Sequence, residues 1–223
     1  QNFRSQVQMI FQDPYESLNP RWTIKNIVAE PLNIHNLGSE EDRLQAVAEM
    51  LTTVGLTPSA NYMDRYPHEL SGGQRQRVSI ARALIMKPKF VICDEPTSML
   101  DVSIRISIMD LMLNLAKELD VSYLYITHDL AVARYMCNRI AVMFNGKIVE
   151  IAETEELLNN PVHPYTKRLI SSIPVPDPSY DRKVYDINFD ELDSLIEKYG
   201  SDKPMIDIGN EHYIATHDVK GII

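Results

Sequence analysis

The sequence predicts an α/β fold with a mostly parallel sheet, and two strand-like runs separated by a helical pattern carry this prediction. Phe90–Cys93 is a short apolar run of the kind that a buried parallel strand shows. Residues 121–126 form a second run, rich in β-branched and aromatic side chains. Between them, from 104 to 119, apolar residues recur every three or four positions, as in a helix. Strands that alternate with helices form an α/β sheet.

The composition is that of an ordinary globular protein. The chain has 223 residues, 44% of them hydrophobic, which is enough for one domain with a real core. The net charge of −9 argues against a protein that binds nucleic acid through its overall field. No stretch approaches the ~18 apolar residues of a membrane span. Two cysteines, Cys93 and Cys137, are too few for a disulfide framework, so we expect buried reduced thiols and a cytosolic compartment.

A further strand lies near the start of the chain. The apolar residues Val7, Met9 and Phe11 recur at every second position, and this period of two indicates a β-strand. The glutamines set against them are Gln6, Gln8 and Gln12. The pattern breaks at Asp13-Pro14, which places Gln12 at a strand-to-loop junction. An amide there can orient a water molecule and bond to metal-bound groups.

Residues 15–87 are interpreted as a helical subdomain inserted between the first and second strands. A helix begins near Ile24, and we expect Pro31 to interrupt it. Ser39 followed three residues later by Asp42 indicates a capped helix start, and an apolar face follows it.

The last helix of this subdomain opens with the sequence LSGGQ at 70–74. Successive glycines, Gly72 and Gly73, let the backbone approach a ligand closely, and the free N–H groups and the helix dipole favour an anion there. Ser71 adds a hydroxyl group at the same place. Basic side chains surround this helix, and a solvated face is the favoured interpretation for most of them. They are Arg65, Arg75, Arg77, Arg82, Lys87 and Lys89, with Arg75 and Arg77 as the exceptions to keep in view.

Two adjacent carboxylates, Asp94 and Glu95, follow the apolar strand directly. Open α/β sheets bind ligands at the carboxyl ends of their strands. Since neighbouring residues of a strand point opposite ways, one carboxylate would suit a metal ion and the other a water molecule. His128 follows the strand at 121–126 at the same edge of the sheet, so we expect it to contact phosphate.

The patterns beyond His128 are shorter. Asn145-Gly146 lies between two apolar runs and favours a tight hairpin turn. A proline cluster after Ile173 marks a linker, and apolar residues from 192 to 199 indicate a short amphipathic helix. The last twenty-odd residues form either a regulatory tail or a loosely ordered end.

Five ordered motifs resemble those of the ATP-binding cassette (ABC) ATPase family, over about residues 5–175. They are VQMIFQDP at 7–14 for the Q-loop, LSGGQ at 70–74 for the signature motif, VICDE at 91–95 for the Walker B strand, SMLD at 98–101 for the D-loop and YITHD at 125–129 for the switch-histidine segment. Two further segments resemble the oligopeptide/dipeptide (peptide/nickel) importer branch, namely YESLNPR at 15–21 and PVHPYTKRLISSIPVPDP at 161–178.

The resemblance implies an ABC-type nucleotide-binding domain of the P-loop NTPase class, incomplete in this chain. It implies a mostly parallel sheet with an inserted helical subdomain. The implied parts are 1–14 as the end of the Q-loop strand, 15–87 as the helical signature subdomain, 88–160 as the α/β core with the Walker B, D-loop and H-loop motifs, and 161–223 as a C-terminal peptide-importer extension and acidic tail.

The resemblance also implies a site for ATP and Mg²⁺. Asp94 would hold Mg²⁺ and Glu95 would polarise the attacking water. His128 would contact the γ-phosphate, and Gln12 would bind near the nucleotide and sense both water and metal. In-line phosphoryl transfer asks mainly for positioning and charge neutralisation, and this set provides both.

The signature residues are implied to serve a second ATP molecule, held by the opposite subunit. Ser71 and Gly73 would bind its γ-phosphate, with Gly72 and Gln74 in the same nucleotide-binding segment. Asp101 would help couple the two sites across the dimer.

The implied protein is the ATPase subunit of a peptide importer, peripheral on the cytoplasmic face of the cell membrane. Its partners would be a second ABC ATPase subunit, transmembrane permease subunits and, indirectly, an extracytoplasmic peptide-binding protein, with no nucleic acid. The transported solute stays open among oligopeptides, dipeptides, nickel and related solutes. The choice between an identical and a paralogous ATPase partner also stays open.

The sequence contains no G-x-x-x-x-G-K-[ST] segment, and it begins at Gln1 without a Met. That segment supplies the N–H cradle, the phosphate-binding lysine and the Mg²⁺ hydroxyl in P-loop proteins. We therefore expect an N-terminally truncated piece of a longer protein, with hydrolysis by the full-length protein and little by this chain alone.

Two alternatives stay open at this point. The chain can be a catalytically silent ABC partner that lends its LSGGQ helix to another subunit's site. It can also be a non-transport ABC ATPase of DNA repair or translation. The segments at 15–21 and 161–178, and the absence of long heptad arrays, disfavour this last alternative.

Overall fold

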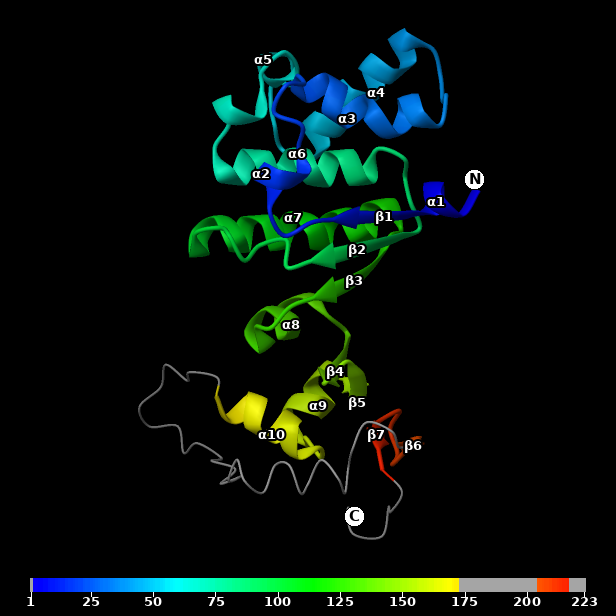
Figure 1. The fold of residues 1–223 in the computed structure, drawn as a ribbon, viewed down its shortest axis with the longest axis vertical. Helices are drawn as coiled ribbons and strands as arrows, with labels where there is room; N and C mark the ends of the chain where they lie inside the picture. Colours follow the sequence, from blue (N-terminus) through cyan, green and yellow to red (C-terminus); the bar gives the residue numbers. More distant parts are fainter. Residues whose placement is uncertain (1, 173–203, 217–223) are drawn as a thin grey trace. The chain divides into compact units, whose positions relative to one another are not determined.

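The computed structural model describes residues 2–172 and 204–216. It divides the chain into two compact units, residues 1–128 (unit 1) and 129–223 (unit 2), shown in Figure 1. This boundary falls inside the 88–160 segment that the resemblance treats as one α/β core. The linker expected after Ile173 and the helix expected at 192–199 lie outside the described residues.

Unit 1 is built on a three-stranded parallel sheet with the strand order β1-β2-β3. Ile10 pairs with Cys93, and Asp94 pairs with Ile126, so the carboxyl ends of all three strands meet at one edge. This confirms the parallel sheet that the sequence predicts, and it aligns the residues that follow each strand. The strands are β1 (Val7–Ile10), β2 (Phe90–Asp94) and β3 (Ser122–Ile126).

The chain between β1 and β2 is helical, as expected for residues 15–87. Helices α3 and α4 both pack on α6, and Figure 1 shows them stacked beyond it on the side away from the sheet. Ile27, Leu51 and Leu84 are among the fully buried side chains of this packing. The elements are α2 (Pro14–Ser17), α3 (Ile24–Ile34), α4 (Glu40–Thr53), α5 (Ala60–Met63), the 3₁₀ helix η1 (Pro67–Glu69) and α6 (Gly72–Leu84).

Two sequence predictions in these helices have opposite outcomes. The capped start of α4 is confirmed, because the Ser39 hydroxyl accepts from the Asp42 N–H and the Asp42 carboxylate accepts from the Ser39 N–H. The expected interruption at Pro31 is wrong, since α3 continues through Pro31 to Ile34. Proline removes one helical donor, but Leu32 is buried and the His35 N–H still closes the last turn on the Pro31 carbonyl.

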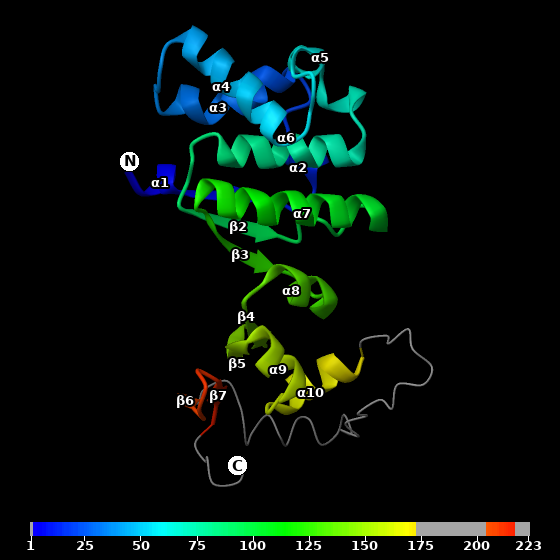
Figure 2. The ribbon, with the colours of Figure 1, turned by 180° about the vertical axis from the view of Figure 1, so that it is seen from behind.

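Two more helices complete unit 1. The short α1 (Asn2–Gln6) leads into β1 and is not predicted from the sequence. The helix expected after Asp101 is confirmed as α7 (Val102–Leu119), which buries Ile108, Met112 and Leu115. Figure 2 shows α7 running beside α6, and the two helices are in contact.

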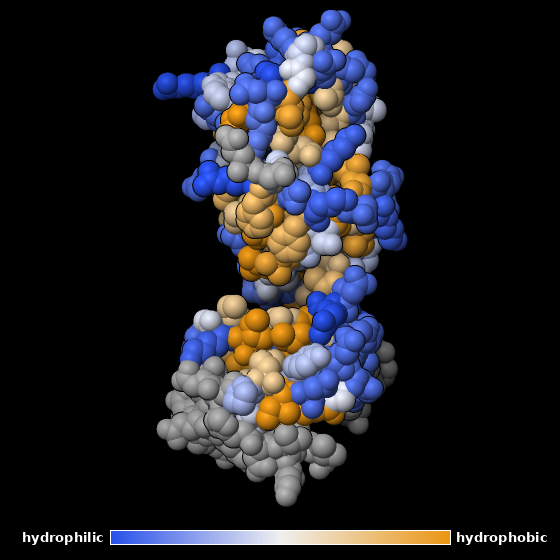
Figure 3. All heavy atoms as spheres, turned by 90° about the vertical axis from the view of Figure 1, so that its right-hand side faces the viewer, coloured by the Kyte–Doolittle hydropathy of each residue, from blue (hydrophilic) through white to orange (hydrophobic). Residues whose placement is uncertain are grey.

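Hydrophobic side chains also lie on the surface of the molecule, as the orange areas of Figure 3 show. In unit 1, Leu124 and Ile126 on β3 are 49% and 45% exposed. They share one face of β3 with Ser122, and that face is exposed, whereas Tyr123 and Tyr125 on the opposite face are partly buried. The apolar pattern at 121–126 therefore predicts a strand correctly without predicting its burial.

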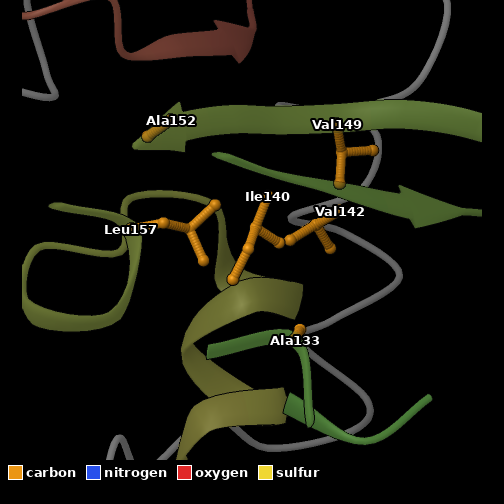
Figure 4. Packing of buried hydrophobic residues seen from close by; sticks show 6 residues of the cluster. All are labelled: Ala133, Ile140, Val142, Val149, Ala152 and Leu157. Carbon is orange, nitrogen blue, oxygen red and sulfur yellow. The ribbon is translucent and has the colours of Figure 1, made fainter. Parts of the chain in front are cut away.

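Unit 2 contains a second, antiparallel sheet with the order β4-β5-β7-β6. Asn145 and Gly146 have φ values of 47° and 78° and turn the β4–β5 hairpin as predicted, because a primed turn needs positive φ at both positions. Figure 4 shows the small apolar core around this hairpin, with Ile140, Val142 and Leu157 pointing toward one another. The elements are α8 (Leu130–Met136), β4 (Arg139–Phe144), β5 (Lys147–Glu153), α9 (Thr154–Asn159), α10 (Pro164–Ser171), β6 (Met205–Asp207) and β7 (Tyr213–Ala215).

Of the two alternatives for the last twenty-odd residues, the loosely ordered end is wrong for residues 205–215, and the regulatory tail stays a prediction. These residues form a second hairpin, in which β7 pairs with β5 through Glu150–Ile214 and Ile151–Tyr213. Each of its strands is only three residues long, too short for a periodic pattern to reveal.

Neither cysteine forms a disulfide, as predicted, and Cys93 is buried while Cys137 is half-buried. Burial raises the pKa of the Cys137 thiol, which disfavours the nucleophilic thiolate form. Among the described residues, no helix combines the length and the hydropathy that crossing a membrane requires.

Candidate functional site

Gln12, Glu95 and His128 meet at the carboxyl edge of the parallel sheet. Each follows a different strand by one or two residues, which is why the parallel register brings them together. The Glu95 carboxylate joins the other two side chains. Its Oε1 lies 2.6 Å from His128 Nδ1, and its Oε2 accepts from Gln12 Nε2 at 3.1 Å.

The backbone at Glu95 is held in an uncommon conformation. Its φ of 42° lies in the left-handed region, which a residue with a side chain adopts only where its surroundings enforce it. The Glu95 N–H donates to the Ile126 carbonyl of β3 at 3.0 Å, and the Glu95 carbonyl accepts from both the N–H and the hydroxyl of Ser98. These bonds turn the chain sharply after β2 and aim the Glu95 carboxylate toward His128.

The site is open on one side. The His128 side chain is 77% exposed, whereas the Glu95 side chain is only 20% exposed. A ligand can therefore reach the His128 imidazole directly, while Gln12 and His128 hold the orientation of the Glu95 carboxylate. Two of the Glu95 lone-pair directions are used by Gln12 and His128, so others remain to accept a proton from a water molecule.

Asp94 is the last residue of β2 and is half-buried. Its carboxylate takes no part in the contacts that join Gln12, Glu95 and His128. Within residues 2–172 and 204–216, no group of three or more His, Cys, Asp and Glu side chains could hold a metal ion. The metal role of Asp94 and Gln12 thus stays a prediction, and a ligand would have to complete the coordination.

The LSGGQ segment forms the capped start of α6. Ser71 is exposed at the N-cap, where its Oγ accepts from the Gln74 N–H at 3.3 Å, and the Gln74 Oε1 accepts from the Ser71 N–H at 3.0 Å. This reciprocal capping box orients the Ser71 hydroxyl and leaves its O–H to donate to a ligand. The exposed position is the one that the sequence-based hypothesis requires.

The two glycines of this segment differ in their surroundings. A Cβ on Gly73 would lie 2.7 Å from Ile104 Cγ2 of α7, too close for any real contact, whereas one on Gly72 would lie 3.7 Å from Leu100 Cδ2. Gly73 therefore allows α6 and α7 to pack closely, a reason that the sequence pattern did not reveal. Its predicted contact with phosphate could come only through its backbone.

Asp101 occupies the N-cap position of α7 and is exposed. Its side chain forms no capping hydrogen bond, so the carboxylate is not used to start its own helix. Its predicted role between two subunits stays a prediction.

Three arginines on α6 are not on a solvated face. Arg75 and Arg77 are the two that the sequence analysis sets apart, while the solvated-face interpretation is wrong for Arg82. Each donates to a carbonyl at the end of a neighbouring helix: Arg75 to Leu70, Arg77 to Val54 at 2.6 Å, and Arg82 to Ser17 at 2.7 Å. Helix ends leave unpaired carbonyls that cations stabilise. Burial lowers the pKa of the Arg77 and Arg82 guanidinium groups, yet arginine keeps its charge. Arg65, Lys87 and Lys89 are exposed as predicted.

Two family models match the chain. The model described as "ABC transporter" matches residues 1–98, and the model described as "Oligopeptide/dipeptide transporter, C-terminal region" matches residues 149–195. The first contains Gln12, the signature segment and Glu95.

Named relatives and a solved structure agree with these models. The oligopeptide transport ATP-binding protein OppF of Bacillus subtilis is 55% identical over 181 residues, which are 81% of this chain and 59% of that protein. The oligopeptide transport ATP-binding protein AmiF of Streptococcus pneumoniae is 50% identical over 214 residues, 93% of this chain and 67% of that protein. The dimeric structure of a post-hydrolysis state of the ATP-binding cassette MJ0796, bound to ADP and Pi, superposes with a TM-score of 0.58 at 33% identity and covers 68% of this chain and 64% of that one. The chain thus spans about three fifths to two thirds of these relatives.

Proposed function

This chain belongs to the ATP-binding cassette transporter family, among relatives that are oligopeptide transport ATPases, and on that premise we propose that the whole protein hydrolyses ATP to energise the import of oligopeptides. The observation that carries the proposal is the Gln12–Glu95–His128 cluster at the open edge of the sheet. A silent partner subunit would need no such arrangement of catalytic side chains. The match at 149–195 favours transport over the other ABC ATPases.

Glu95 is proposed to orient the attacking water and to receive its proton. Its carboxylate is held at one oxygen by His128 and at the other by Gln12, so it cannot rotate freely when a water molecule binds. The exposed His128 imidazole would bind the γ-phosphate and stabilise the charge that develops on it. Phosphoryl transfer needs positioning and charge neutralisation more than covalent chemistry by the protein.

The donor atoms near this cluster fit Mg²⁺. This ion prefers oxygen ligands and usually keeps several waters and substrate phosphates in its shell. The half-buried Asp94 carboxylate is an oxygen donor outside the Glu95 cluster, and the Gln12 amide oxygen is left over because Gln12 bonds to Glu95 through its nitrogen. Bound Mg²⁺ would neutralise negative charge on the phosphates.

The signature segment is proposed to serve the nucleotide of a second ATPase chain. Ser71 is exposed with its O–H available, and Asp101 is exposed without a cap bond of its own. Ser71 with Gly72, Gly73 and Gln74 would bind the γ-phosphate of the ATP that the second chain holds. Asp101 would couple the two ATP sites. We further propose permease subunits as partners at the membrane, an extracytoplasmic peptide-binding protein as an indirect one, and a peripheral position on the cytoplasmic face.

The test is hydrolysis by the full-length protein carrying Glu95→Gln. Loss of a positioned general base typically costs about 10²–10⁴ in rate, so we expect turnover to fall by that factor while ATP binding persists. Glu118→Gln, at an exposed position on α7, is the matched control and should hydrolyse ATP normally. Undiminished turnover in Glu95→Gln would refute the proposal. Residues 1–223 alone should hydrolyse ATP poorly, because they contain no G-x-x-x-x-G-K-[ST] segment.

A further inference from the structure

Arg75 lies between the loop that follows Gln12 and the signature segment. Its side chain is almost fully buried, and its Nε and Nη2 both donate to the Leu70 carbonyl, at 3.0 and 2.6 Å. The guanidinium also lies over the ring of Tyr15, whose centroid is 3.7 Å from the Arg75 Cζ. A guanidinium at this distance from a ring face is attracted by the ring quadrupole.

The peptide group between Leu70 and Ser71 is held on both sides. Arg75 fixes its carbonyl, and the Gln74 Oε1 fixes its N–H at 3.0 Å. Because a peptide group is planar, holding both its oxygen and its hydrogen fixes its orientation. That orientation determines where the Ser71 side chain begins, and the bond from the Gln74 N–H then holds the Ser71 Oγ at 3.3 Å.

The contacts also extend from Tyr15 in the other direction, through Gln12 to Glu95. Tyr15 belongs to α2, which starts two residues after Gln12 and is capped by Asp13 through the Tyr15 N–H at 2.7 Å. At the C-terminal end of α2, the Ser17 carbonyl accepts from Arg82 of α6. Helix α2 is therefore attached to α6 at two points, while Gln12, two residues before α2, donates to the Glu95 carboxylate.

We propose that Tyr15 and Arg75 form a clamp that positions the Ser71 hydroxyl relative to Gln12. The clamp links the loop that contacts Glu95 in one site to the signature segment that serves the nucleotide of a second chain. It rests on the proposed function, since it takes the ligand of Ser71 to be that nucleotide. Neither side chain touches the reacting atoms, so both are positioning residues.

Tyr15 allows a clean test because its side chain is 62% exposed and its removal creates no cavity. In the full-length protein, Tyr15→Leu removes the ring while keeping apolar bulk, and Tyr15→Phe keeps the ring as the matched control. Amide hydrogen exchange at residues 70–75 is measured first, because it needs no ATP. We expect exchange about tenfold faster in Tyr15→Leu and unchanged in Tyr15→Phe, from the typical strength of a cation–π contact.

The second readout is ATP turnover by the same variants. We expect Tyr15→Leu to lower kcat about tenfold with KM for ATP and the melting temperature unchanged, and Tyr15→Phe to match the parent protein. Equal exchange at 70–75 in Tyr15→Leu and the parent protein would overturn the clamp, and so would a Tyr15→Phe variant as defective as Tyr15→Leu. Glu95→Gln, run in parallel, separates the two proposals. Normal turnover in Glu95→Gln would refute the proposed function, while the exchange result still decides the clamp.

Discussion

Glu150→Gln is the perturbation that most directly probes how unit 2 is held together. Glu150 is fully buried on β5, and its carboxylate is the acceptor for two other segments. Its Oε1 accepts from the Val162 N–H at 2.8 Å and lies 2.7 Å from His212 Nε2, while its Oε2 accepts from the His163 N–H at 3.0 Å. One carboxylate thus joins β5, the loop before α10 and the turn between β6 and β7.

The magnitude follows from counting donors and acceptors. Glutamine has the same shape as glutamate, but one of its oxygens is replaced by an amide nitrogen that donates. Whichever way the amide is turned, either the part-buried backbone N–H of Val162 or the buried one of His163 then faces another donor. A buried donor left without an acceptor costs about 1–3 kcal/mol, and the remaining bonds lose the strength that a charged acceptor provides. We therefore expect a loss of roughly 2–4 kcal/mol in the stability of unit 2.

Hydrogen exchange is the suitable assay, because it reports on individual segments, whereas the single tryptophan of residues 1–223, Trp22, lies in unit 1. In the full-length protein, amides of β5 and of the 205–215 hairpin should exchange roughly 30- to 1000-fold faster in Glu150→Gln. Glu211→Gln is the matched control, since Glu211 is exposed next to His212. Equal exchange in the two variants would refute the reasoning, because it would mean that the buried carboxylate does not hold these segments.

Two further predictions concern unit 1, where Trp22 fluorescence can follow unfolding. Gly73→Ala should lower stability by about 1–2 kcal/mol, since its Cβ would lie 2.7 Å from Ile104, although alanine favours the helix. Gly72→Ala, with 3.7 Å of space, should be neutral or stabilising, and equal effects of the two variants would contradict the packing argument. Hydrogen bonds from the Ser39 backbone and side chain lower the pKa of Asp42 below its ordinary value of 3.8. The ionised Asp42 carboxylate therefore stabilises α4 above pH 3.8, and this stabilisation is lost as the pH falls through the lowered pKa of the folded state. Asp42→Asn should therefore melt earlier at pH 7, and the difference should disappear under acidic conditions; a constant difference down to acid pH would exclude this origin.

The chain order of the strands was enough to predict that Glu95 and His128 share one edge of the sheet, because each follows a strand and parallel strands end at one edge. The role of Gln12 came from the family resemblance, and the structure places its amide against Glu95. The reciprocal cap of Ser71 and Gln74 and the turn at Asn145-Gly146 are also local, since their partners lie within four residues. Local chemistry of this kind is readable because it depends on spacing and side-chain type.

Only the tertiary structure decided which distant groups became partners. Arg77 donates to the carbonyl of Val54, 23 residues away, and His212 bonds to Glu150, 62 residues away. In neither pair does the sequence around one residue identify its partner. Gly73 carries a glycine pattern that points to a ligand, yet its missing side chain is required by the approach of Ile104 from α7. A residue's type and spacing determine what it can bond to, but burial and the packing of remote segments determine which group actually stands within 3 Å of it.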